Sequence, residues 1–184
     1  KKREGKACYI STAASNATRI ARVAEEKGAS LEGTKFRVRG EPFTEAKRTI
    51  IEKVGASAIP SYGSNDAGVV GLGCANPRYT DEVHALEHRL ALIPQPTPRS
   101  GKEGSIQPLL FTTVNPQESR LLLNVDIGDY AVTDHRECGC ALNRIGLKLH
   151  LHHIRSHEKF SSEGMNYFYG DLFEVFEKVL PAEF

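Results

Sequence analysis

Four side chains that bind soft metals place the strongest constraint on how this chain can fold. Cys74 and His84 lie close together in the sequence, and Cys138 and Cys140 follow far downstream. Three thiolates and one imidazole complete a tetrahedral zinc shell with no open position, which is typical of a structural site. Such a site requires the two distant segments to meet. The Cys-x-Cys spacing is tighter than the usual Cys-x2-Cys, so three ordinary cysteines without a metal stay open as an alternative. His88 is a possible ligand in place of His84.

The composition is that of a globular protein with a core. The 184 residues are enough for one domain or two small ones, and 40% are hydrophobic and 26% charged. The net charge of +1 argues against a nucleic-acid or membrane surface built on bulk charge. Neither a membrane-spanning apolar run nor a signal-type segment after Lys1-Lys2-Arg3 is found, so we predict a cytoplasmic protein. Four cysteines in such a chain do not suggest a disulfide framework.

The first part of the chain, 1–73, alternates strand and helix patterns. We predict strands at 6–11, 34–39 and 57–62, and helices at 17–27 and 44–54. Ile20, Val23 and Ala24 share one face of the first helix, and Thr44 caps the second. This order predicts an α/β fold, a parallel sheet with covering helices. Ligands of such sheets bind at the carboxyl ends of the strands.

The second part, 74–153, predicts a small antiparallel, β-barrel-like subdomain that carries the zinc site. Its extended segments are 83–94, 106–114, 120–125, 130–133 and 147–155. Alternation places His150 and His152 on one strand face, which we interpret as a polar face; a second metal-binding pair is the alternative. The remainder, 154–184, is expected to be a hinge and the start of a small carboxyl-terminal domain, with an amphipathic helix over 170–180.

Six short motifs occur in an order that resembles a known family. They are Glu41-Pro42-Phe43-Thr44, Ser61-Tyr62-Gly63-Ser64-Asn65-Asp66, Phe111-Thr112-Thr113, Gly128-Asp129, Ile154-Arg155-Ser156 and Gly164-Met165-Asn166. Together they cover most of the chain and resemble the acyl-adenylate-forming enzymes, most closely the phenylacetate–coenzyme A ligase branch. The Cys-x-Cys pair after Gly128-Asp129 also resembles that branch. The resemblance implies that a carboxylate attacks ATP to form an acyl-adenylate, and that a thiol then displaces AMP.

The resemblance also implies roles for individual residues. Asp129 would bind the ribose hydroxyls, Tyr62 would lie against adenine, and Asp66 would reach Mg²⁺ on the phosphates of ATP. Arg155 would approach the phosphates at the hinge. The remaining cofactor-binding positions are Gly40, Glu41, Pro42, Gly63, Ser64 and Asn65. The chain departs from the family pattern where Asn65 replaces a hydroxyl residue and Asp66 a glutamate. A turn aspartate at Asp129 and a core tyrosine at Tyr62 are the structural alternatives.

Two family elements have no match here, the phosphate loop before Gly40 and the carboxyl-terminal domain with its lysine. We therefore expect a middle to carboxyl-terminal segment of an ATP-dependent carboxylate–AMP ligase, inactive by itself. Its partners would be an aromatic or fatty carboxylic acid and the thiol of coenzyme A or a carrier protein, with no nucleic acid and no membrane; a homodimer is left open. The alternative is a zinc-stabilised nucleotide- or acyl-binding module without chemistry. The near-zero net charge disfavours a zinc ribbon for nucleic acid.

Overall fold

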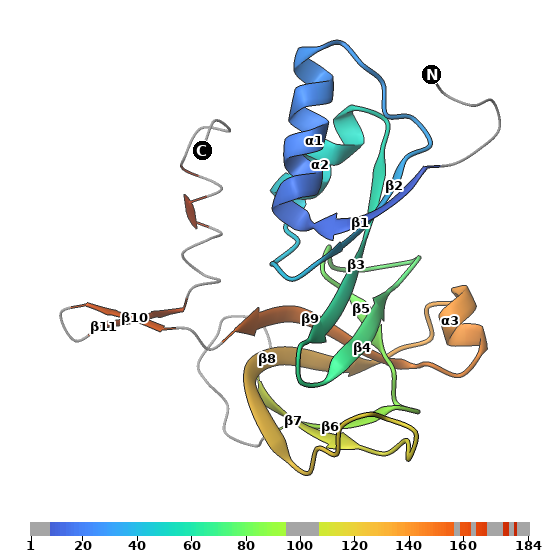
Figure 1. Ribbon diagram of the computed structural model, residues 1–184, viewed down its shortest axis with the longest axis vertical. Helices are drawn as coiled ribbons and strands as arrows, with labels where there is room; N and C mark the ends of the chain where they lie inside the picture. The colour runs from blue at the N-terminus through green and yellow to red at the C-terminus, as the bar shows by residue number, and fades with distance from the viewer. Residues whose placement is uncertain are drawn as a thin grey trace.

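The computed structural model describes residues 8–94, 107–156, 159–162, 165–168, 175–176 and 179. Its main feature is a nine-stranded sheet with the strand order β1-β2-β3-β4-β5-β9-β8-β7-β6 (Figure 1). The strands are β1 (Tyr9–Ala13), β2 (Lys35–Arg39), β3 (Ser57–Ser64), β4 (Gly68–Gly73), β5 (Val83–Ala85), β6 (Leu90–Pro94), β7 (Gln107–Thr113), β8 (Val125–His135) and β9 (Leu149–Ser156). β10 (Lys159–Ser162) and β11 (Met165–Phe168) form a separate two-stranded sheet.

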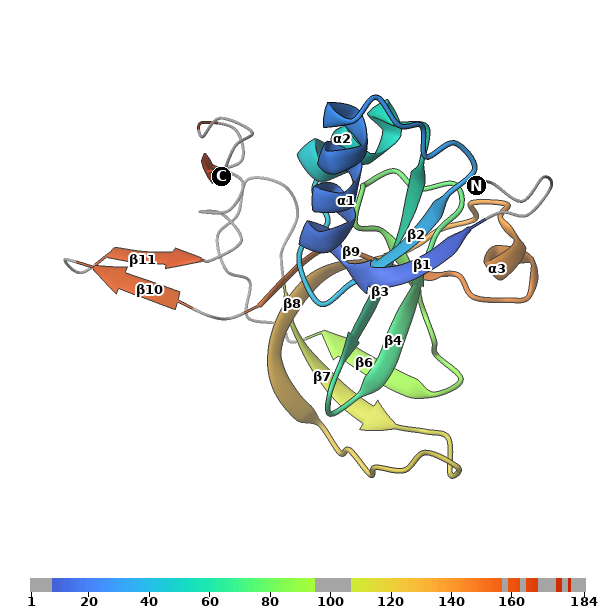
Figure 2. The ribbon, with the colours of Figure 1, turned by 45° about the horizontal axis from the view of Figure 1, so that its top comes forward.

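Three helices accompany the strands in the described part of the chain. They are α1 (Ala14–Glu26), α2 (Glu45–Lys53) and the short α3 (Ala141–Arg144). Helices α1 and α2 lie side by side next to strands β1 to β3, as Figures 1 and 2 both show. Thr44 caps α2 as predicted, because its Oγ1 accepts a hydrogen bond from the Lys47 backbone N–H. The helix expected over 170–180 falls mostly outside the described residues.

The predicted fold class, a parallel sheet with covering helices followed by a separate antiparallel part, is wrong. The nine main strands form one mixed sheet in which only β1-β2 and β2-β3 pair in parallel. All other neighbours in that sheet are antiparallel. The reason lies in the connections, since parallel strands need a long crossover such as those through α1 and α2. After β3 the chain turns back directly through Asn65–Ala67, so β4 must run antiparallel.

The buried face of α1 also differs from the predicted one. Ile20 and Val23 are 40% and 42% exposed, whereas the buried positions are mainly alanines. The buried residues of α1 are Ala14, Ala17, Thr18, Ala21 and Ala24. Small side chains at helical spacing let the helix approach its neighbours closely, and Phe36, Phe43 and Ile51 fill this core instead.

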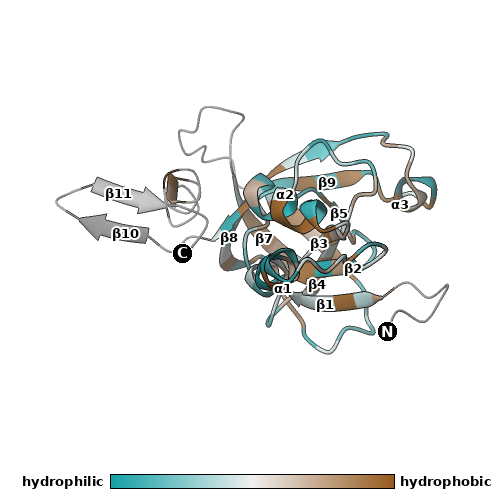
Figure 3. Cartoon of the chain, turned by 90° about the horizontal axis from the view of Figure 1, so that it is seen from above, coloured by the Kyte–Doolittle hydropathy of each residue, from teal (hydrophilic) through white to brown (hydrophobic). Residues whose placement is uncertain are grey.

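A second hydrophobic core lies within the antiparallel part of the sheet. It contains residues from β4, β5, β7, β8 and β9, among them Val70, Val83, Phe111, Ala131 and Leu151. Figure 3 draws the hydrophobic residues of these strands in brown. This core packs the strands next to the four candidate metal ligands and those that carry Tyr62 and Asp129. A search of the described helices finds none with the length and apolar character to cross a membrane.

Candidate metal centre

Strand pairing brings the four predicted metal ligands together. Cys74 directly follows β4, and His84 is the middle residue of β5, which pairs with β4. His84 also pairs with His150 of β9 on its other side. Cys138 and Cys140 lie in the segment between β8 and α3, and Cys140 occupies the N-cap position of α3. The prediction that the two distant segments meet at these residues is confirmed.

The end of β4 is fixed closely against β3. A Cβ atom on Gly73 would lie 2.1 Å from Ile59 Cγ2 and 2.6 Å from the Pro60 carbonyl oxygen. Any larger residue at this position would push the strands apart. The glycine thus lets β3 hold the backbone directly before Cys74.

The ligand atoms of Cys74, His84, Cys138 and Cys140 all lie within 4.8 Å of one another. His84 Nε2 is 3.1 Å from Cys140 Sγ and 3.6 Å from Cys138 Sγ. The other ring nitrogen, His84 Nδ1, lies 2.8 Å from the Leu147 carbonyl oxygen. A backbone carbonyl on Nδ1 holds the proton there and leaves Nε2 free to bind a metal, an arrangement common around metal-binding histidines. The residues therefore can hold a metal ion, and His84, not the exposed His88, is the histidine of the cluster.

Two of the thiols have opposite ionisation tendencies. Burial raises the pKa of Cys74 to about 12, although the Asn76 backbone N–H counteracts this. At Cys140 burial also opposes ionisation, but hydrogen bonds from the Asn143 backbone, Cys138 and the Ala75 backbone outweigh it and lower the pKa to about 6. Cys140 is thus ready to act as a thiolate ligand, whereas Cys74 needs a cation nearby to become one.

Sequence reasoning missed two charged residues beside the cluster, Glu82 and Arg136. Glu82 is 1% exposed, and Arg136 forms an ion pair with it. His150, predicted to lie on a polar strand face, is fully buried, with its ring 4.1 Å from that of His84. His152, predicted for the same face, is also buried and stacks on Tyr79. A charged pair without a motif gives no sequence signal, because its burial depends on the packing of strands distant in the sequence.

Two of the residues predicted to bind a nucleotide are in direct contact. The Tyr62 hydroxyl donates a hydrogen bond to Asp129 Oδ2 at 2.6 Å, although β4, β5 and β9 separate their strands in the sheet order. The sheet is therefore strongly curved. The pKa of Asp129 is raised, mainly by burial and further by the nearby charge of Asp126. The hydrogen bond from Tyr62 lowers this pKa but does not outweigh burial. Burial, followed by the Asp129 carboxylate, raises the pKa of Tyr62.

Arg155 lies on β9, the strand next to β8 in the sheet. It is the register partner of Tyr130, the residue after Asp129. Its Nη1 is 3.6 Å from Asp81 Oδ2, and Asp81 also accepts the Ile154 backbone N–H at 2.8 Å. The side chain is 16% exposed, so Asp81 holds Arg155 close to the surface of β9.

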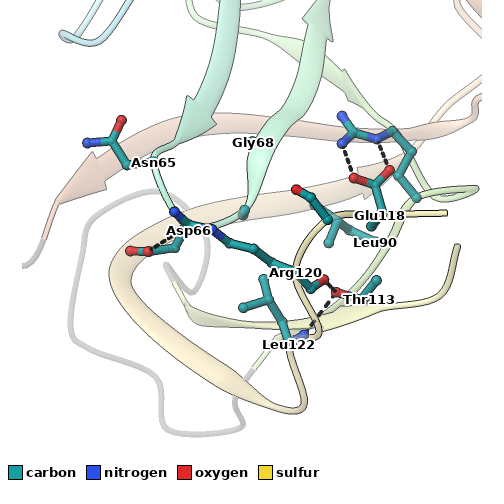
Figure 4. Close-up of a pocket in the computed structure, with 11 residues that line it drawn as sticks. Asn65, Asp66, Gly68, Leu90, Thr113, Glu118, Arg120 and Leu122 are labelled. Atoms are coloured by element: carbon teal, nitrogen blue, oxygen red, sulfur yellow. Dashed lines mark hydrogen bonds and ion pairs between the residues drawn. The ribbon is translucent and has the colours of Figure 1, made fainter. Parts of the chain in front are cut away.

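The other predicted site residues lie apart from Tyr62 and Asp129 or have local partners. Asp66 forms an ion pair with Arg120 at 2.6 Å across a small pocket, as Figure 4 shows. Ser64 Oγ accepts the Ala67 backbone N–H, and Gly63 lies at a bulge between β3 and β4. Asn65 lines the same pocket as Asp66.

The Gly40-Glu41-Pro42 segment makes contacts within the helical part of the molecule. The Glu41 carboxylate accepts hydrogen bonds from Ser15 N and Oγ, both at 2.8 Å, at the start of α1. The Pro42 carbonyl accepts one from Lys47 Nζ at 2.9 Å, and Gly40 has a positive φ of 76°. These contacts stabilise the turn between β2 and α2.

Comparison with known proteins adds no family to these observations. Neither the scan against protein-family models nor the search of curated proteins finds a match for this chain.

Proposed function

We propose that Cys74, His84, Cys138 and Cys140 hold a structural zinc ion. The observation that carries this proposal is the convergence of three sulfur atoms and one imidazole nitrogen within 4.8 Å. This donor set favours zinc over hard cations such as Mg²⁺, and four protein ligands leave no position for a substrate or water. The ion stabilises the fold and takes no part in a reaction.

The zinc ion clamps two segments that the sheet alone does not join. On one side are the end of β4 and the strand β5, and on the other the segment between β8 and α3. β4 pairs with β3, which carries Tyr62, and β8 carries Asp129. The ion fixes β8 relative to β4 and, through β4, relative to β3. It thereby keeps the Tyr62–Asp129 contact in place.

Metal analysis tests this proposal directly. The purified chain is expected to contain about one zinc ion, and Co²⁺ in its place is expected to give the intense visible bands of a tetrahedral thiolate site. Zinc-free protein that retains its fold, or an octahedral Co²⁺ spectrum, would contradict it.

A second function, nucleotide binding, is supported by the contact between Tyr62 and Asp129. We propose that this chain forms part of an ATP-dependent carboxylate–AMP ligase and that these residues contact the adenosine of ATP or AMP. Asp129 offers a carboxylate that can accept two ribose hydroxyls, and Tyr62 offers an aromatic ring beside it. Arg155 is the proposed ligand of the phosphate, and to reach it the side chain would have to leave Asp81, with which it pairs. Mg²⁺ bound through Asp66 belongs to the same proposal and would require Asp66 to leave Arg120.

The variant Asp129→Asn is expected to weaken AMP binding by roughly 10- to 100-fold, since a hydrogen bond to a charged group contributes about 1.5–3 kcal/mol. Titration calorimetry of the zinc-loaded chain measures the change. Asp134→Asn is a matched control on the same strand, because Asp134 pairs with Arg78 at the surface. Equal AMP affinity in the wild type and both variants would exclude Asp129 as the ribose ligand.

A further inference from the structure

A charged pair is buried directly beside the proposed zinc ligands. The side chains of Glu82 and Arg136 are 1% and 10% exposed. Buried ion pairs rarely add stability over apolar residues of similar size, because both charges lose their hydration. The burial of this pair beside the proposed ligand Cys74 therefore needs an explanation other than fold stability.

Arg136 contacts the ligand Cys74 and the loop around it. Its Nη2 lies 3.8 Å from Cys74 Sγ and donates to the Asn76 carbonyl oxygen at 3.0 Å. Asn76 in turn donates its backbone N–H to Cys74 Sγ at 3.3 Å, and its side-chain amide to the Cys138 carbonyl at 2.9 Å. The guanidinium thus contacts the proposed ligand Cys74 directly, and through Asn76 it is linked to the backbone of Cys138.

Glu82 holds the guanidinium in this place. Its carboxylate accepts hydrogen bonds from Arg136 and from the backbone N–H groups of Arg78 and Tyr79. His150 Nδ1 lies 2.6 Å from it. The Glu82 carbonyl accepts the Cys74 backbone N–H at 3.1 Å, so the residue that anchors Arg136 also anchors Cys74.

The charge of the filled site explains the need for a cation. Three thiolates and a neutral imidazole leave a zinc ion with a net negative charge in a buried place. Groups outside the ligand shell commonly orient the ligands and tune their basicity. We infer that Arg136 is a positioning residue of the metal centre, which neutralises and orients the Cys74 thiolate while Glu82 fixes its guanidinium. This inference rests on the proposed zinc site and adds Arg136 as a residue that raises the affinity of the site for zinc.

Zinc affinity, measured by competition with a chromophoric chelator, tests this role. Arg136→Gln is expected to weaken zinc binding 10- to 100-fold, the range typical of residues that support metal ligands from outside the shell. Arg136→Lys keeps the charge and is expected to recover part of the affinity. Arg78→Gln is the matched control, because the Arg78 side chain is 63% exposed and pairs with Asp134, and the substitution keeps the backbone N–H that Glu82 accepts. It is expected to bind zinc as the wild type does.

The double variant Glu82→Gln/Arg136→Gln separates a role at the thiolate from a role in folding. It leaves neither charge buried alone, so it is expected to fold even where Arg136→Gln does not. We expect its zinc affinity to stay 10- to 100-fold low. In the Co²⁺ form the sulfur-to-metal charge-transfer band is expected to move to lower energy, since a thiolate without its N–H donor gives up electrons more easily.

The outcomes distinguish this inference from the proposal on which it rests. Wild-type protein that binds no zinc overturns both. Wild-type protein that binds zinc, with wild-type affinity and band position in the double variant, overturns the role of Arg136 alone. An Arg136→Gln variant that folds and binds zinc as tightly as the wild type also overturns the role of Arg136 alone.

Discussion

Replacing Cys140 with serine is expected to remove the bound zinc and to lower the melting temperature by roughly 10–15 °C. A ligand present at about 1,000 times its dissociation constant stabilises the folded state by about 4 kcal/mol, and for a chain of this size each kcal/mol corresponds to about 2–4 °C. The effect is large because Cys140 is buried and its Sγ lies 3.1 Å from His84 Nε2. A serine hydroxyl at the same place is a poor zinc ligand.

Thermal unfolding of both proteins in excess zinc, together with their metal content, checks this expectation. Cys8→Ser provides the control, because Cys8 is exposed and lies outside the cluster. It should keep both its metal and its melting temperature. A chelator is expected to lower the wild-type melting temperature to that of Cys140→Ser and to leave the variant unchanged. If Cys140→Ser retained a full zinc ion, the four-residue site would be wrong.

Truncating Phe111 to alanine is expected to lower the free energy of unfolding by about 3–5 kcal/mol. Phe111 is fully buried in β7, in the core formed with β4, β5, β8 and β9. Loss of the ring removes apolar contacts and leaves a cavity that the surrounding strands cannot fill. Urea unfolding of the zinc-loaded proteins measures the difference.

Phe111→Leu controls for the size of the cavity. It keeps most of the apolar volume, so its cost is expected to stay below about 1.5 kcal/mol. The zinc content of both variants should remain that of the wild type, because Phe111 belongs to the hydrophobic core and is not one of the proposed ligands. A loss below about 1 kcal/mol in Phe111→Ala would show that this core is poorly packed.

Phe111 also shows that a residue of a motif that resembles a family can have a structural role. It begins the Phe111-Thr112-Thr113 motif, which the sequence links to a nucleotide-binding family, yet its own role is packing. Thr112 Oγ1 accepts the Asn124 backbone N–H, and Thr113 Oγ1 donates to the Arg120 carbonyl and accepts the Leu122 N–H. All three residues therefore stabilise β7 and the loop that follows it.

Local sequence signals were sufficient for the first strands and helices. The Thr44 cap acts over a few residues, and the first strands and helices form near the predicted places. The sheet as a whole was predicted incorrectly, because the direction of a strand depends on its connection and its neighbours. The exposed Ile20 and Val23 likewise follow from what packs on α1.

The sequence by itself determined which side chains can bind a soft metal, because the chemistry of cysteine and histidine does not depend on the fold. It also predicted that, if a metal binds, the segment of Cys74 meets Cys138 and Cys140. Only the tertiary structure decided that His84 is the histidine of the cluster, because only strand pairing sets which side chains face the cysteines. It alone also placed Glu82 and Arg136 beside the candidate metal ligands, since burial of a charge depends on contacts between segments distant in the chain.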